Sequence, residues 1–229
     1  MANYENGLDT KDHILQAAKE LFYRKGYVGT TFKEISLLSK VNQGLIVYHF
    51  QNKASLANAV FRDYIKQSTR DIDREFSETD ELTRDFLSDY LYFRLIFEDS
   101  NFRRFMNVCC KNGYLTKKND AVNDETYLTY FWRMTDTMTE DMGPDSDLME
   151  SIIEVFEGVK NSYTCHICEN YKRVNIREAS ENYIYIYCKL FGISEEHYGP
   201  PMMDAQILSN QVSVSIIDFE FEMTKVRTK

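Results

Sequence analysis

The chain has 229 residues, of which 43% are hydrophobic and 28% charged, a composition typical of a globular protein and not of a disordered one. No apolar run approaches the roughly 18 residues of a membrane-spanning helix, and the N-terminus lacks the apolar core of a secretory signal. The five cysteines, an odd number, favour a reducing compartment over a disulfide framework. We therefore expect a cytoplasmic protein that does not bind a membrane.

The net charge of −9 is unevenly distributed along the chain. Residues 1–68 carry nine basic and six acidic side chains, a net charge of +3. Residues 69–229 carry eighteen basic and thirty acidic side chains, a net charge of −12. A mildly basic head on an acidic body is the distribution expected of a small DNA-binding unit attached to a sensor.

Four helices are predicted in the N-terminal third. The first spans residues 11–24, with Thr10 as its N-cap and Gly26 as its stop, because apolar residues recur there at helical spacing. Thr31 followed three residues later by Glu34 predicts a capping box at the start of the second helix. The third helix runs from Asn42, its N-cap, to about residue 49. The fourth starts at Asn52 or Ser55 and extends to Phe76.

The remaining chain is predicted to be helical, with glycines and prolines separating the helices. One segment, residues 212–216, alternates like a strand, but no partner strand is evident, so we predict a helix there. The fold class is therefore all-α: a three-helix DNA-binding domain over residues 1–52 and a helical sensing and dimerisation domain over 53–229, connected by helix 53–76. The helices predicted in the body span residues 80–98, 100–111, 120–141, 146–172, 176–191 and 203–226.

Short helices with a tight turn before the third predict a helix-turn-helix, whose third helix lies in the major groove of DNA. Asn42, Gln43 and Gly44 open this helix, and Asn or Gln side chains pair with adenine through two hydrogen bonds. Tyr48, His49 and Lys53 follow and are suited to contact phosphates.

The segment from Ile14 to Leu56 resembles the N-terminal domain of the TetR (tetracycline-repressor-like) family of transcriptional regulators, in matching order and spacing. The family's small-Gly pair at the turn is Ser39-Lys40 here, so Lys40 must adopt the geometry that glycine adopts easily. The residues that carry the resemblance are Ala17-Ala18, Leu21-Phe22, Lys25-Gly26-Tyr27, Thr30-Thr31, Ile35, Val41, Gly44, Tyr48-His49-Phe50, Asn52-Lys53 and Leu56.

The resemblance implies that the third helix faces DNA and that Thr31 and Lys53 touch the phosphate backbone. It also implies a homodimer on a palindromic operator in double-stranded DNA, with a small-molecule effector in the body. The complete set of DNA-binding candidates is Thr31, Lys33, Asn42, Gln43, Gly44, Val47, Tyr48, His49 and Lys53.

Aromatic residues gather along three predicted helices of the body, and aromatic walls with a few hydroxyls suit a pocket for a flat ligand. A plain packed core is the alternative for each single ring. The C-terminal helices are the candidates for dimer contacts, with Tyr183, Tyr185 and Tyr187 in one and residues 207–219 in the other. The ligand-pocket candidates are Tyr90, Phe93, Phe97, Phe105, Tyr127, Phe131 and Trp132.

Cysteines 165 and 168 form a CxxC motif, but a structural zinc site usually shows a second clear pair, which is missing here. We therefore expect no metal and no cofactor. The sequence shows no nucleophile paired with a base and no phosphate-binding glycine loop, so we expect no enzyme. The leading hypothesis is a ligand-responsive repressor. The alternatives are a transcriptional activator, a redox-responsive regulator or a helical protein-interaction module.

Overall fold

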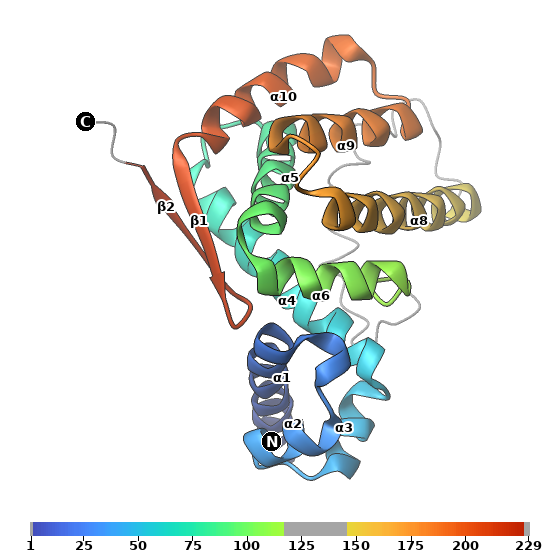
Figure 1. Ribbon diagram of the computed structural model, residues 1–229, viewed down its shortest axis with the longest axis vertical. Helices are drawn as coiled ribbons and strands as arrows, with labels where there is room; N and C mark the ends of the chain where they lie inside the picture. The colour runs from blue at the N-terminus through green and yellow to red at the C-terminus, as the bar shows by residue number, and fades with distance from the viewer. Residues whose placement is uncertain (1, 117–145, 227–229) are drawn as a thin grey trace.

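The computed structural model describes residues 2–116 and 146–226, and it confirms the predominantly helical fold class (Figure 1). The predicted helix at residues 120–141, with Tyr127, Phe131 and Trp132, lies outside the described residues. The described helices are α1 (Ala2–Gly29), α2 (Phe32–Ser39), α3 (Gln43–Phe50), α4 (Lys53–Glu75), α5 (Glu81–Glu98), α6 (Ser100–Lys111), α8 (Ser146–Asn170), α9 (Ile176–Leu190) and α10 (Glu195–Ser209).

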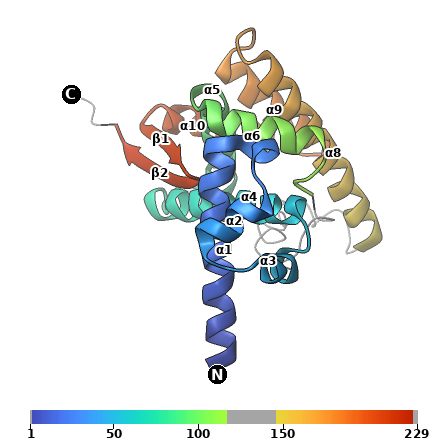
Figure 2. The same cartoon turned by 60° about the horizontal axis from the view of Figure 1, so that its bottom comes forward.

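Helices α1, α2 and α3 gather at one end of the molecule, which we call the head (Figure 1). The body is formed by α5, α6, α8, α9 and α10, and α4 runs from the head into it. Figure 2 shows α3 on the side away from α9 and α10, with the N-terminal part of α1 extending beyond it. Within the parts of the chain that are described, no helix has the length and hydropathy needed to cross a membrane.

Local capping fixes where the head helices begin. Thr31 and Glu34 form the predicted capping box, and Asn42 accepts a hydrogen bond from the Leu45 amide at 3.0 Å. Asn52, rather than Ser55, caps α4, since its side chain accepts from the Ser55 amide. Each such cap stabilises a helix start by about 1 kcal/mol.

The predicted start of the first helix is wrong, because α1 begins at Ala2 and Thr10 lies inside it. The apolar spacing marks only the face that packs, and a helix extends from an existing turn without further apolar contacts. The helix is interrupted at Gly26, where φ is 74° and ψ is 170°. Only glycine adopts this backbone conformation without strain.

The predicted helix over residues 203–226 is also wrong. Helix α10 ends at Ser209, and the chain continues as an antiparallel hairpin of β1 (Val212–Ile217) and β2 (Glu220–Lys225). The alternation in β1 is therefore a true strand signal, and its partner directly follows it. The second strand was missed because it is rich in charged residues and because Asp218-Phe219 is an unusual pair for a two-residue turn with positive φ.

The aromatic side chain of Phe219 explains this turn. Its φ is 60°, yet the side chain is fully buried, with its ring 4.7 Å from that of Phe105 and 5.9 Å from that of Phe102. The hairpin is held from the side by Gln67 of α4, which accepts from the Phe221 amide at 2.9 Å and donates to the Phe219 carbonyl at 3.3 Å. Burial of the ring thus offsets the strained backbone.

The hairpin also contacts the head. Lys19 of α1 is only 1% exposed, and its ammonium lies 2.6 Å from the carboxylate of Asp63 in α4 and 2.5 Å from that of Glu220 in β2. Arg24 of α1 reaches Asp218 in the turn at 3.4 Å. Residues far apart in the sequence therefore join α1, α4 and the hairpin at one point.

Replacing Phe219 with alanine should lower the free energy of unfolding by about 3–5 kcal/mol, because it removes a fully buried ring from the core. Chemical denaturation followed by circular dichroism measures this loss. Ile217→Ala is the matched control, since Ile217 lies in the same hairpin but is 64% exposed. Equal losses for the two variants would show that the hairpin does not depend on this ring.

Candidate nucleic-acid interface

One face of helix α3 is buried in the head, and the opposite face is exposed to solvent. Ile46 and Phe50, one turn apart, are fully buried. The opposite side leaves Gln43 and Gly44 exposed, together with Val47 at 47% and Tyr48 at 79%. A short helix that is anchored in this way has the form of a recognition helix that enters a major groove.

The turn before α3 has the geometry that the sequence analysis required of it. Lys40, which follows α2, has φ 59° and ψ 22°, in the left-handed region. The Val41 amide donates to the Ser39 hydroxyl at 3.3 Å within the same turn. A lysine therefore occupies the position where glycine is free of strain, at a cost of about 1 kcal/mol.

The start of α2 combines a cap with an ion pair. Thr31, exposed to solvent, donates its amide to Glu34 at 2.9 Å, and Lys25 approaches the same carboxylate at 2.6 Å. The hydrogen bonds from Lys25 and Thr31 lower the pKa of Glu34 to about 2. Lys33 is also exposed, in the first turn of α2. This corner of the head is thus ordered at neutral pH, with Thr31 and Lys33 facing solvent.

Lys53 has intramolecular partners at the end of α1. Its ammonium donates to the carbonyls of Tyr27 at 3.1 Å and Thr30 at 3.0 Å, and lies 4.4 Å from the centre of the Tyr27 ring. Burial lowers the pKa of Lys53. These contacts fix the lysine between α1 and α4, and one N–H of the ammonium is left for a phosphate.

His49 is half-buried beside Tyr48 and Phe50, with ring centres 5.1 Å and 6.4 Å away. Burial, together with the positive charge of Lys11, lowers the pKa of His49. The neutral imidazole is therefore favoured at pH 7, which suits a hydrogen bond more than an ion pair with a phosphate.

The sequence analysis did not single out Leu45, which is 40% exposed on α3 next to Gln43 and Gly44. An apolar side chain at this place suits contact with a thymine methyl group. The signal was present in the sequence, because burying Ile46 and Phe50 at a spacing of four turns the side chain of Leu45 away from the core.

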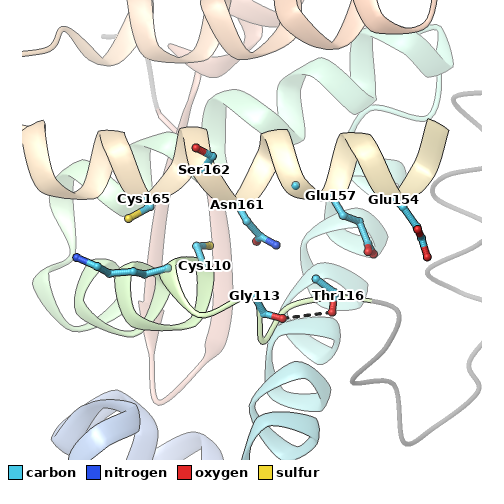
Figure 3. Close-up of a pocket in the computed structure, with 10 residues that line it drawn as sticks. Cys110, Gly113, Thr116, Glu154, Glu157, Asn161, Ser162 and Cys165 are labelled. Atoms are coloured by element: carbon cyan, nitrogen blue, oxygen red, sulfur yellow. Dashed lines mark hydrogen bonds between the residues drawn. The ribbon is translucent and has the colours of Figure 1, made fainter. Parts of the chain in front are cut away.

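Three of the described ligand-pocket candidates, Phe93, Phe97 and Phe105, pack against other aromatic rings. Phe93 lies 5.3 Å from Tyr183 and Phe105 lies 5.5 Å from Phe22, as distances between ring centres. Tyr90 is 4% exposed, and Phe97 is half-buried, 6.5 Å from Tyr171. A cavity of about 770 Å³ lies elsewhere, between α8 and the end of α6, and is lined by other residues (Figure 3).

The cysteines lie in α6, α8 and α9, and none is paired in a disulfide. Burial raises the pKa of the thiols of Cys168 and Cys188 to about 12, and raises that of Cys165 as well. Protonated thiols are poor nucleophiles and poor metal ligands. Among the described residues, no three His, Cys, Asp or Glu side chains are grouped so that they could hold a metal ion.

Comparisons with known proteins concern mainly the head. Residues 14–60 match the family model described as bacterial regulatory proteins, tetR family. The probable HTH-type transcriptional regulator ArpR of Pseudomonas putida is 35% identical over 78 residues, which cover 34% of this chain and 37% of that protein. The HTH-type transcriptional regulator QacR of Staphylococcus aureus is 47% identical over 49 residues, which cover 21% of this chain and 26% of that protein. The chain thus matches about a third of the length of these relatives.

Two solved structures resemble the whole chain weakly. A gamma-butyrolactone receptor described as ArpA-like is 17% identical with a TM-score of 0.39, over 90% of this chain and 98% of that one. NalD, the secondary repressor of the MexAB-OprM multidrug efflux pump in Pseudomonas aeruginosa, is 17% identical with a TM-score of 0.43, over 82% of this chain and 97% of that one.

The capped helices, the left-handed turn at Lys40 and the anchored α3 form a helix-turn-helix unit. This unit lies within residues 14–60, the segment that matches the tetR family model.

Replacing Lys53 with methionine should lower the free energy of unfolding by about 1–3 kcal/mol in the absence of DNA, because two charge-assisted hydrogen bonds to carbonyls are lost. Urea denaturation measures the change. Lys33→Met is the control, since Lys33 is exposed and its removal should change stability little. If the two variants were equally stable, the contacts of Lys53 with α1 would not contribute to folding.

Proposed function

We propose that this protein is a sequence-specific DNA-binding transcriptional regulator, and that it is a repressor which leaves its operator when a small molecule binds the body. The observation that carries the proposal is α3, whose buried Ile46 and Phe50 present Gln43, Gly44 and Tyr48 to solvent. Gln and Asn side chains at the start of such a helix reach adenine edges in the major groove. The tetR family match over residues 14–60 supports this role, and it favours a regulator over an enzyme.

Helix α6 offers a physical connection between the body and the head. Its C-terminal end, at Cys110 and Lys111, lines the cavity beside α8. Its middle contacts α1, because Arg104 donates to the carbonyls of Tyr23 at 2.8 Å and Arg24 at 2.9 Å. A shift of α6 that follows ligand binding therefore moves the end of α1.

Gly26 lies at this contact. A Cβ atom there would lie 2.9 Å from Nε of Arg104, which is at the end of a flexible side chain and can shift. The positive φ of Gly26, and not a lack of space, therefore requires the glycine.

In a dimer on its operator, the two recognition helices stand about 34 Å apart, one turn of DNA. A ligand that binds more tightly to an arrangement with a different spacing lowers the affinity of the dimer for DNA. The size of this loss is set by the difference between the ligand's binding free energies for the two arrangements. The repressor mechanism thus needs two copies, two arrangements of α1 relative to the body, and an effector that binds one arrangement better.

Specific DNA binding is tested by selection from genomic fragments followed by footprinting at several salt concentrations. The purified protein should protect a partly palindromic site. Gln43→Ala should relax the preference at one or two base pairs, each worth about 1–3 kcal/mol. Lys33→Ala should weaken binding to every sequence and reduce the salt slope by about one unit.

Gln43→Ala and Lys33→Ala form a matched pair, since both replace exposed residues of the head. A uniform loss of affinity for both would mean that α3 does not read bases. No preference for any sequence over random duplex would refute DNA-specific regulation, and would leave a protein-interaction module as the better description.

Exposed apolar side chains on α10 offer a surface for a second copy. Met203 is 62% exposed and Ile207 is 51% exposed, one helical turn apart. Tyr185 of α9, 49% exposed, adds an aromatic side chain. Other candidates from the sequence analysis are buried inside the protomer and unavailable for contact, namely Tyr183, Tyr187, Val212, Ile216 and Phe219.

Ile207→Glu should convert a homodimer into a monomer and weaken operator binding, because a single head loses the effective concentration that a linked second head provides. Sedimentation equilibrium on the full chain measures the oligomeric state. Ile217→Glu is the control, since Ile217 is 64% exposed but lies in the hairpin. A wild-type monomer at tens of micromolar, or dimers of both variants, would place the dimer contact elsewhere or exclude it.

A further inference from the structure

The cavity between α8 and the end of α6 contains a polar side chain without a partner. Asn161 of α8 is only 7% exposed and lines this cavity of about 770 Å³. Among the described residues, its side-chain amide makes no hydrogen bond. Figure 3 shows Asn161 pointing from α8 toward the segment of Gly113 and Thr116. A buried amide without a partner costs free energy unless a ligand or water binds it, and the volume falls within the range of about 300–1,000 Å³ for ligand pockets.

Two carboxylates lie on the same side of α8. Glu154 and Glu157 are one turn apart, and both point toward the cavity (Figure 3). Glu157 is 5% exposed. Glu154 makes no ion pair with any described residue. The carboxylates and the Asn161 carbonyl oxygen thus provide hydrogen-bond acceptors along one wall of the cavity.

Glu154 is exposed to solvent and has no cation beside it among the described residues. Lys111 lines the cavity, but its ammonium lies 3.1 Å from the carboxylate of Glu169. Lys160 is influenced by the carboxylates of Asp89 and Glu157, which oppose the lowering of its pKa by burial. The described cations thus leave the carboxylate of Glu154 available to a positively charged occupant.

The residues that line the cavity restrict the class of ligand that it can bind. None of the described residues that line the cavity is aromatic, so none of them offers a ring on which a flat aromatic cation could stack. A Cβ atom placed on Gly158 would meet no atom within 4 Å, so the wall of α8 is open at that point. The space and the acceptors therefore fit a flexible chain with N–H donors.

From these observations we infer that the cavity beside α8 binds an aliphatic ammonium ligand, held by Glu154, Glu157 and Asn161. The inference rests on the proposed function, since such a ligand would be the effector of the regulator. The charged, flexible ligand differs from the flat ligand expected from the sequence, whose pocket was predicted from other residues.

The test uses the full chain at pH 7 and hexane-1,6-diamine as the probe, with binding measured by isothermal titration calorimetry in the absence of DNA. Hexane-1,6-diol and adipate are matched neutral and anionic controls of the same chain length. The diamine should bind about tenfold more tightly than the diol, and adipate should not bind. Comparable binding of all three, or no binding of the diamine, would overturn the inference.

Two pairs of variants locate the site. Glu157→Gln should weaken diamine binding by about tenfold, whereas Glu98→Gln, an exposed change of equal charge at the end of α5, should not. Gly158→Leu should fill the cavity and abolish binding, whereas Gly158→Ala should retain it. Thermal melts establish whether each variant is folded. If Glu157→Gln does not fold, the comparison of Gly158→Leu with Gly158→Ala still decides the location of the site. Diamine binding that survives Gly158→Leu would contradict this site.

DNA binding is then measured separately, by footprinting with and without the diamine. Binding of the diamine with no change in the footprint would support the site and refute the ligand-responsive part of the proposed function. Specific DNA binding by a chain that ignores the diamine would leave the regulator intact and overturn the ammonium site.

Discussion

A buried ammonium group joins the parts of this molecule. Lys19 lies in α1, and its charge is balanced by Asp63 of α4 and Glu220 of β2. Since an unpaired buried charge is strongly destabilising, α1 keeps its place only while both neighbouring elements keep theirs. The orientation of α3 depends in turn on α1, because both helices contribute to one continuous core. The orientation of the exposed face of α3 thus depends on the ion-pair triad formed by Lys19, Asp63 and Glu220.

This arrangement makes the head part of the body, although its sequence resembles an independent module. The ring of Phe22 in α1 packs against that of Phe105 in α6, which contacts Phe219 of the hairpin turn. Arg104 adds polar contacts from α6 to the end of α1. Because α6 also borders the cavity, one short helix faces both the DNA-reading unit and the space where an effector is proposed to bind. Coupling between the two sites requires only that α6 occupy two positions.

The parts of the structure that were predictable from the sequence are those governed by neighbouring residues. The caps at Thr31, Asn42 and Asn52 follow from side chains that bind amides two or three residues away. The left-handed turn at Lys40 was anticipated from the resemblance to the TetR family, in which glycine occupies that position. The hairpin was not predictable. The positive φ of Phe219 is strained, and the strain is offset by burial of its ring among rings from α1 and α6. No pattern of neighbouring residues indicates this burial. The cavity was not predictable for a similar reason. In the sequence, Asn161 and Glu157 are ordinary polar residues of a helix, and only the packing of α6 beside α8 shows that they line a cavity.

The ion-pair triad also has a consequence for biosynthesis. Lys19 and Glu220 are 201 positions apart in the chain. At a synthesis rate of about 5–20 residues per second, α1 exists for about 10–40 s before its last partner is made. During that interval the Lys19 ammonium remains hydrated, so α1 is held back from its final burial. The exposed face of α3 therefore reaches its native orientation only after the hairpin has been synthesised.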